Sequence, residues 1–240
     1  MRLTLLSNSA SPDQPYLSHA LAAIKEISFN DPIAFIPFAL HDRSNYTEKI
    51  RTALHTLGNE ILEVPHDRLK ALDVIGKCKT VFVGGGNTFR LLKTLHDLEL
   101  VEPISNLVIS GEISYLGSSA GTNVACPEIR TTNDMPIVVP NSFRALNLVP
   151  FQINPHYMDA DPKSRHMGET REQRISEFLE ENETLVIGIR EGAWLELKDD
   201  QLRLNGENGG VLFRRGHQSE EIETGSDLNW LLGLSPNFDS

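Results

Sequence analysis

The chain has 240 residues, 40% of them hydrophobic, and its formal net charge is −11 at pH 7. This acidic balance argues against broad binding to nucleic acid or to an anionic membrane, because both need a basic surface. The two cysteines form no C-x-x-C pair, so we expect no structural zinc site and two reduced thiols, as in a cytoplasmic protein. The first apolar run, Leu3 to Leu6, is too short for a signal region, so we expect no targeting signal, and no apolar run reaches membrane-spanning length.

Strand and helix patterns alternate through the first half of the chain. In chain order, the prediction is strand 3–6, helix 15–27, strand 33–38, helix 47–57, strand 61–64, helix 69–75, strand 80–83, helices 88–98 and 101–109, and strand 113–116. Repeated alternation with apolar strands is typical of an α/β protein. It predicts a mostly parallel sheet covered by helices on both faces.

The second half is less regular. Its predicted elements are a short strand at 151–153, a charged helix at 169–181, a strand at 185–189, and antiparallel strands within 193–204 and 211–214. These last strands predict a small antiparallel element near the C-terminus. Because no linker-like run interrupts the chain, we expect one domain over 1–240, ending in a loose extension at about 225–240.

The most informative segment is Gly117-Ser118-Ser119-Ala120-Gly121, which lies between a predicted strand and a helix-compatible stretch at 122–126. Strand, G-x-S-x-G and helix form the pattern of a nucleophile elbow, in which the serine occupies a strained turn. Glycines at both ends lack the Cβ that would collide with neighbouring backbone. The free N–H groups of the helix start suit a developing oxyanion. A glycine-rich turn without chemistry is the alternative.

A serine nucleophile needs a base, usually histidine, and a carboxylate that orients the imidazole. Among eight histidines, His156 is favoured because it ends a predicted apolar strand, where a parallel sheet forms its site. Two carboxylates remain open at this point. Asp134 would give the order Ser, Asp, His of α/β-hydrolases, whereas Glu191, at another strand end, would give Ser, His, Glu.

The run Gly84-Gly85-Gly86-Asn87 also follows a predicted strand. Backbone without Cβ permits close approach of a substrate carbonyl, so this run is a second candidate source of oxyanion donors. A dinucleotide loop would need glycine where Phe89 stands, and no Walker-type G-K-S/T occurs. We therefore expect no nucleotide or other cofactor, and a plain turn is the remaining alternative.

Together these motifs resemble peptidase E, the α-aspartyl dipeptidase family. The matching segments are 5–9 (LLSNS), 83–89 (VGGGNTF), 117–121 (GSSAG), 129–136 (IRTTNDMP), 152–156 (QINPH), 168–174 (GETREQR) and 191–192 (EG), in family order. The resemblance implies hydrolysis, in the cytoplasm, of dipeptides with an N-terminal aspartate. It also implies a class I glutamine amidotransferase-like fold, with serine replacing the cysteine of those enzymes.

The resemblance also implies roles for individual residues. Ser119 would be the nucleophile, His156 the base, Glu191 or Asp134 the acid, Gly86 and Ala120 the oxyanion donors, Arg171 the partner of the substrate aspartate, and Asn87 a further substrate contact. Ser118 stands where relatives carry tryptophan, which predicts a different pocket wall. The loop 157–167, with Asp159, Asp161, Lys163 and Arg165, and the extension after Gly225 also depart from the family pattern.

Two other functions stay open on the sequence. One is a cyanophycinase-like exopeptidase of the same fold, which would release β-aspartyl-arginine units from a polymer. The other is a ligand-binding relative that has lost turnover. If the protein is an enzyme, we expect small peptides as its only class of substrate. We expect the protein to be a monomer or a homodimer.

Overall fold

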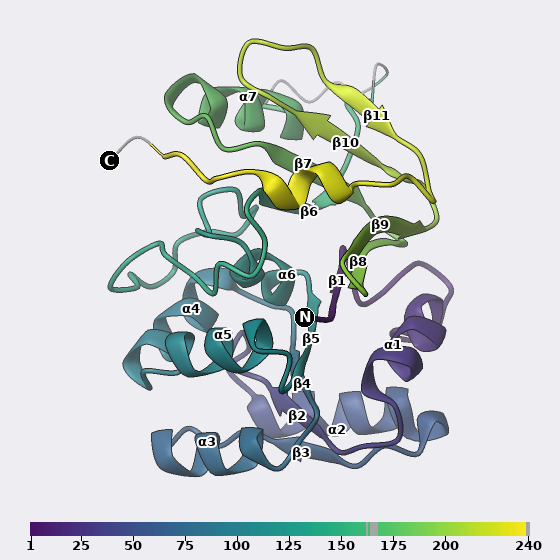
Figure 1. Cartoon of the computed structure of the whole chain (residues 1–240), viewed down its shortest axis with the longest axis vertical. Helices are drawn as coiled ribbons and strands as arrows, with labels where there is room; N and C mark the ends of the chain where they lie inside the picture. The colour runs from purple at the N-terminus through teal and green to yellow at the C-terminus, as the bar shows by residue number, and fades with distance from the viewer. Residues whose placement is uncertain (162, 164–167, 239–240) are drawn as a thin grey trace.

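The computed structural model describes residues 1–161, 163 and 168–238 (Figure 1). A seven-stranded sheet has the order β3-β2-β4-β5-β1-β8-β9. Its strands are β1 (Leu3–Leu6), β2 (Ile33–Ile36), β3 (Ile61–Glu63), β4 (Thr80–Val83), β5 (Ser114–Ser118), β8 (Ala193–Lys198) and β9 (Gln201–Gly206). The strands from β3 to β1 pair in parallel, and the β8–β9 hairpin joins β1 antiparallel. The predicted mostly parallel sheet is confirmed.

Helices cover both faces of this sheet (Figure 1). They are α1 (Leu21–Ser28), α2 (Arg43–Leu54), α3 (Arg68–Gly76), α4 (Thr88–Asp97), α5 (Val101–Ile109) and the short α6 (Ala120–Ala125). Strand β4 shows why two layers form, because its side chains alternate between faces. Phe82 packs with α1 and α2, whereas Val81 and Val83 pack in a separate cluster with α3 to α6.

A second sheet has four strands in the order β11-β10-β7-β6. They are β6 (Gln152–Tyr157), β7 (Val186–Arg190), β10 (Gly210–Phe213) and β11 (Glu220–Ile222), and α7 (Arg171–Glu181) covers the sheet. Strands β6 and β7 are parallel, and β10 and β11 add antiparallel. The predicted antiparallel strands near the C-terminus are thus present, but they belong to two different sheets. The β8–β9 hairpin extends the first sheet, and β10 belongs to the second.

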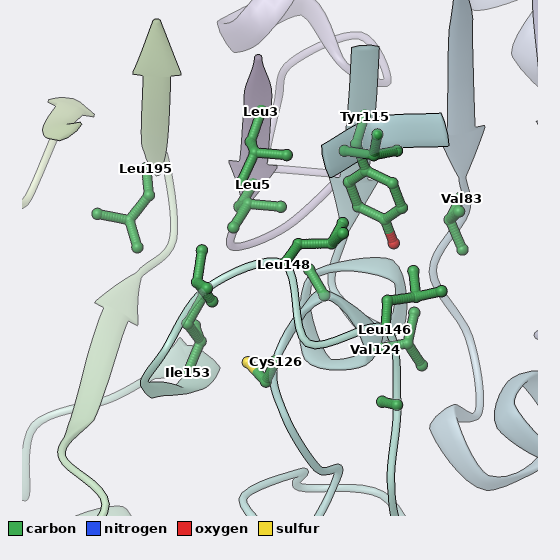
Figure 2. Close-up of a cluster of buried hydrophobic side chains, with 14 of the residues drawn as sticks. Leu3, Leu5, Val83, Tyr115, Val124, Cys126, Leu146, Leu148, Ile153 and Leu195 are labelled. Atoms are coloured by element: carbon green, nitrogen blue, oxygen red, sulfur yellow. The ribbon is translucent and has the colours of Figure 1, made fainter. Parts of the chain in front are cut away.

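One apolar cluster joins the two sheets. Figure 2 shows Leu3 and Leu5 of β1 and Leu195 of β8 facing Ile153 of β6, with Val124 of α6 nearby. All five of these side chains are 1% exposed or less. This continuous core supports the proposal that residues 1–240 form one domain. No helix in the described ranges is long and apolar enough to cross a membrane.

The segment after Gly225, for which the sequence predicts a loose extension, is held against the protein. Leu228 is 4% exposed and Leu231, in a short 3-10 helix at Asn229–Gly233, is fully buried. The backbone N–H of Leu228 donates to Leu202 O at 2.9 Å, and Asn237 exchanges hydrogen bonds with Thr184. Two buried leucines therefore anchor a segment that is expected to be loose because chain ends are often poorly ordered.

Candidate active site

Ser119 occupies a sharp turn between β5, which ends at Ser118, and α6, which begins at Ala120. Its backbone has φ 53° and ψ −108°, a conformation that non-glycine residues rarely adopt. The chain packs closely on both sides of the turn. A Cβ on Gly117 would lie 2.7 Å from Gly121 O, and one on Gly121 would lie 2.0 Å from Val83 O. Only glycine fits these two positions without displacement of backbone.

His156 and Glu191 lie in a row with this serine. His156 Nε2 is 2.9 Å from Ser119 Oγ, and His156 Nδ1 is 2.6 Å from Glu191 Oε1. Because an ionised carboxylate only accepts hydrogen bonds, Nδ1 carries the hydrogen and Nε2 accepts from the serine hydroxyl. The row forms because β6 and β7 are parallel neighbours, so the end of β6 at His156 and the residue after β7, Glu191, share one edge.

Asp134 lies elsewhere, with its carboxylate at the start of α4. Its Oδ2 accepts from Thr88 N at 2.7 Å and from Thr88 Oγ1 at 2.6 Å, and Thr132 Oγ1 is 3.3 Å away. A carboxylate at a helix N-terminus satisfies a free N–H and complements the helix dipole. Of the two acids that the sequence leaves open, the structure brings Glu191 to His156 and uses Asp134 to hold the 131–135 loop on α4.

The glycine run after β4 lies against Ser119. A Cβ on Gly85 would be 3.1 Å from Ser119 Cβ, and Gly86 has φ 132° with Ala39 O only 2.8 Å from where its Cβ would stand. The side chain of Asn87, expected to contact substrate, caps α4 by accepting from Arg90 N at 3.0 Å and donates to Met135 O at 2.9 Å. Ala120 begins α6, where backbone N–H groups have no partner within the helix.

Arg171 is the first residue of α7 and is half-buried. Burial and the charge of Arg174 lower the pKa of Arg171, and the carboxylate of Asp134 opposes this change. Asp134 lies in the 131–135 loop. That loop is tied to the site, because Asn133 Nδ2 donates to Pro155 O at 2.7 Å, one residue before His156.

The structure describes the surroundings of two departures from the family pattern. Ser118 is fully buried, and its hydroxyl shares a 2.6 Å hydrogen bond with that of Ser9. In the loop 157–167, Asp159 forms a bidentate pair with Arg190, with both N–O distances at 2.7 Å. Residues 162 and 164–167, including Arg165, lie outside the described residues.

The three residues that follow β1 have no role predicted from the sequence. The side chains of Ser7, Asn8 and Ser9 are buried and contact residues at or beside the serine, histidine and glutamate of the row. The sequence feature that could have indicated a role for them is a run of three small polar residues directly after an apolar strand, since buried polar groups need specific partners.

Known proteins resemble this chain over nearly its whole length. Residues 3–205 match the family described as peptidase family S51. Peptidase E of Streptomyces coelicolor is 48% identical over 241 residues, covering 100% of this chain and 98% of that protein. The "Probable alpha-aspartyl dipeptidase" of Drosophila melanogaster is 43% identical over 235 residues, covering 96% and 97%.

A solved structure shares the fold. The crystal structure of a peptidase from an acI-B1 actinobacterium superposes with a TM-score of 0.66 at 18% identity, covering 95% of this chain and 96% of that one. The family match and the full-length relatives show that this chain belongs to peptidase family S51.

Proposed function

We propose that this protein is a serine-type dipeptidase that hydrolyses dipeptides with an N-terminal aspartate in the cytoplasm. The observation that carries the proposal is the row of hydrogen bonds from Ser119 Oγ through His156 to Glu191, at 2.9 and 2.6 Å. The names of the relatives, peptidase E and "Probable alpha-aspartyl dipeptidase", supply the substrate class. A strand, a strained serine and a helix in succession support a nucleophile elbow at Ser119.

The proposed reaction passes through an acyl-enzyme. Ser119 Oγ attacks the peptide carbonyl while His156 Nε2 takes its proton, and Glu191 stabilises the imidazolium that forms. The N–H groups of Gly86 and Ala120 would stabilise the oxyanion. His156 then gives its proton to the leaving amine, and the peptide C–N bond breaks. Water, activated by the same histidine, hydrolyses the ester and restores the serine.

Arg171 would bind the side-chain carboxylate of the substrate aspartate. Its guanidinium is partly withdrawn from water, and burial lowers its pKa. A partly desolvated cation gains most from a carboxylate ligand, which can accept two parallel N–H bonds from a guanidinium. The proposed specificity for aspartate thus rests on a charge at the start of α7, outside the row of hydrogen bonds.

The test is hydrolysis of Asp-Leu, Glu-Leu and Ala-Leu. Ser119→Ala should abolish hydrolysis, with a loss of about 10⁴-fold or more. Arg171→Ala should remove the preference for Asp-Leu, whereas Arg174→Ala, with a side chain that is 52% exposed, should keep it. Glu191→Gln should lower kcat by about 10⁴-fold, because the imidazole loses its orienting carboxylate. Asp134→Asn should leave kcat far closer to wild type.

Three results would redirect the proposal. Broad cleavage that is lost in Ser119→Ala would keep the nucleophile and reject aspartate selectivity. Release of arginine-containing dipeptides from a β-aspartyl-arginine polymer, without dipeptide hydrolysis, would favour a cyanophycinase-like enzyme. A folded protein that fails to react with a serine-directed phosphonate would favour a ligand-binding relative.

A further inference from the structure

A polar turn at the end of β1 lies where the two sheets meet. Ser7 and Asn8 are fully buried, and Ser9 is 8% exposed. None of the three side chains takes part in the reaction proposed above. Burying polar groups is unfavourable unless each finds a hydrogen-bond partner, so their partners indicate what the turn is for.

Ser7 contacts the strand that carries the histidine and the strand that precedes the glutamate. Its Oγ accepts from the backbone N–H of His156 at 2.9 Å and donates to Ile189 O at 2.8 Å. His156 has φ 54°, in the left-handed region that non-glycine residues rarely occupy. The Ser7 hydroxyl therefore fixes the backbone of His156 in an unusual conformation, on which the direction of its imidazole depends.

Asn8 contacts the residue after the glutamate. Its Oδ1 accepts from Gly192 N at 2.9 Å, and its amide group donates to Ala10 O at 2.7 Å and Ser11 Oγ at 3.1 Å. On the other side, Asn208 Nδ2 donates to Glu191 O at 2.9 Å. The backbone that carries Glu191 is thus held from two directions.

The same turn contacts the residue before the nucleophile. Ser9 Oγ and Ser118 Oγ share a buried hydrogen bond of 2.6 Å. The backbone of Ser119 is bound to the end of β1 as well, because its N–H donates to Leu6 O at 3.1 Å. Residues 6–9 therefore bind the backbone of Ser119 and of His156, and the backbone N–H next to Glu191.

We propose that Ser7, Asn8 and Ser9 are positioning residues that set the separation of Ser119, His156 and Glu191. Ser119 follows β5 of the seven-stranded sheet, and His156 lies in β6 of the four-stranded sheet. Glu191 lies between β7 of the four-stranded sheet and β8 of the seven-stranded sheet. Alignment of the row therefore depends on how the two sheets are joined, and this turn joins them beside the reacting atoms. The inference rests on the proposed function.

The test compares Ser7→Ala with Ser28→Ala. Ser28 is also fully buried, and its hydroxyl donates to Ile24 O at 2.7 Å, at the end of α1. Both changes delete a buried hydroxyl, so both should lower thermal stability. Because a misplacement of about 1 Å can cost about 10²-fold, we expect Ser7→Ala to reduce kcat for Asp-Leu by about 10- to 100-fold. KM should change by less than about twofold, since no group that binds substrate is lost. Ser28→Ala should keep the wild-type kcat.

Two further readouts do not depend on the peptide substrate. One is the labelling rate with a serine-directed phosphonate, which should fall in Ser7→Ala by a factor similar to that of kcat. The other is the downfield proton NMR signal expected of the 2.6 Å bond between His156 and Glu191, which should shift or broaden in Ser7→Ala and stay in Ser28→Ala. If wild type is labelled but does not hydrolyse Asp-Leu, the proposed substrate is wrong, and the labelling ratio still decides the present inference.

A second variant, Ser9→Ala, tests the proposal if Ser7→Ala does not fold. Ser9→Ala is the milder change, because the Ser118 hydroxyl is its single side-chain partner among the described residues, and it should slow labelling several-fold. The proposal is overturned if folded Ser7→Ala, or folded Ser9→Ala in its place, matches Ser28→Ala in both labelling rate and NMR signal.

Discussion

Replacing Gly121 by alanine should destabilise the protein and slow hydrolysis together. The new Cβ would stand 2.0 Å from Val83 O, where ordinary contacts begin near 3.4 Å, so α6 must move away from β4 by more than an ångström. Overpacking of this kind costs about 1–3 kcal/mol. Because the obstructing atom is backbone and cannot rotate aside, we expect about 3 kcal/mol, or a fall in Tm of roughly 6–12 °C for a chain of this size.

The measurement is thermal unfolding by circular dichroism, with Asp-Leu hydrolysis in parallel. Since α6 begins beside Ser119, its displacement should also lower kcat by about 10²-fold. Gly76→Ala is the matched control, because its Cβ would meet nothing within 4 Å at the end of α3 and should be neutral or stabilising by about 0.4–1 kcal/mol. A Gly121→Ala protein that melts and hydrolyses like the control would refute the close-packing argument.

Three other predictions concern thiols, the C-terminal segment and a helix cap. Burial raises the pKa of Cys78 to about 11 and that of Cys126 to about 12, so both remain thiols at neutral pH, and DTNB should react with neither until the protein unfolds. Rapid reaction of the native protein would contradict this. Leu231→Ala should lower the free energy of unfolding in urea by about 2–5 kcal/mol, and Trp230→Ala, at a side chain that is 49% exposed, by much less. Equal losses would mean that Leu231 is not the anchor. Thr170→Ala removes a capping box and should cost about 1 kcal/mol, seen as faster amide exchange in the first turn of α7. Unchanged amide exchange would mean that the capping box does not stabilise α7.

The central strands could be predicted from the sequence because strands buried on both faces read as unbroken apolar runs. The predicted strand 80–83 coincides with β4, and all four of its residues are buried. Helix boundaries were less predictable. The helix expected from residue 15 begins only after Leu17, whose φ is 62°, with a 3-10 turn at Ser18–Ala20 and the α-helix from Leu21, a break that hydrophobic periodicity does not reveal. The helix expected from residue 47 begins at Arg43, where the side chain of Asp42 caps it.

The residues of the candidate site also differ in how well the sequence predicts them. The signals for Ser119 and His156 are local, a glycine-flanked serine after one strand and a histidine at the end of another. The choice between Asp134 and Glu191 is not local, since it depends on β6 pairing with β7 and on Thr88 binding Asp134. Those contacts join residues far apart along the chain, and one sequence without its relatives carries no record of them.

The central position of β1 has a consequence for synthesis on the ribosome. Although β1 emerges first, Leu3 pairs with Tyr115 on one side and with Leu197 on the other. The partner on one edge, β5, is synthesised only from residue 114 onward, and the partner on the other edge, β8, only from residue 193 onward. The β8 edge of an apolar strand therefore stays unpaired until most of the chain has been translated, and unpaired strand edges invite aggregation. Pairing at such sequence separations is also slow. Truncated chains that end before β8 leave one edge of β1 unpaired and should therefore accumulate as insoluble material.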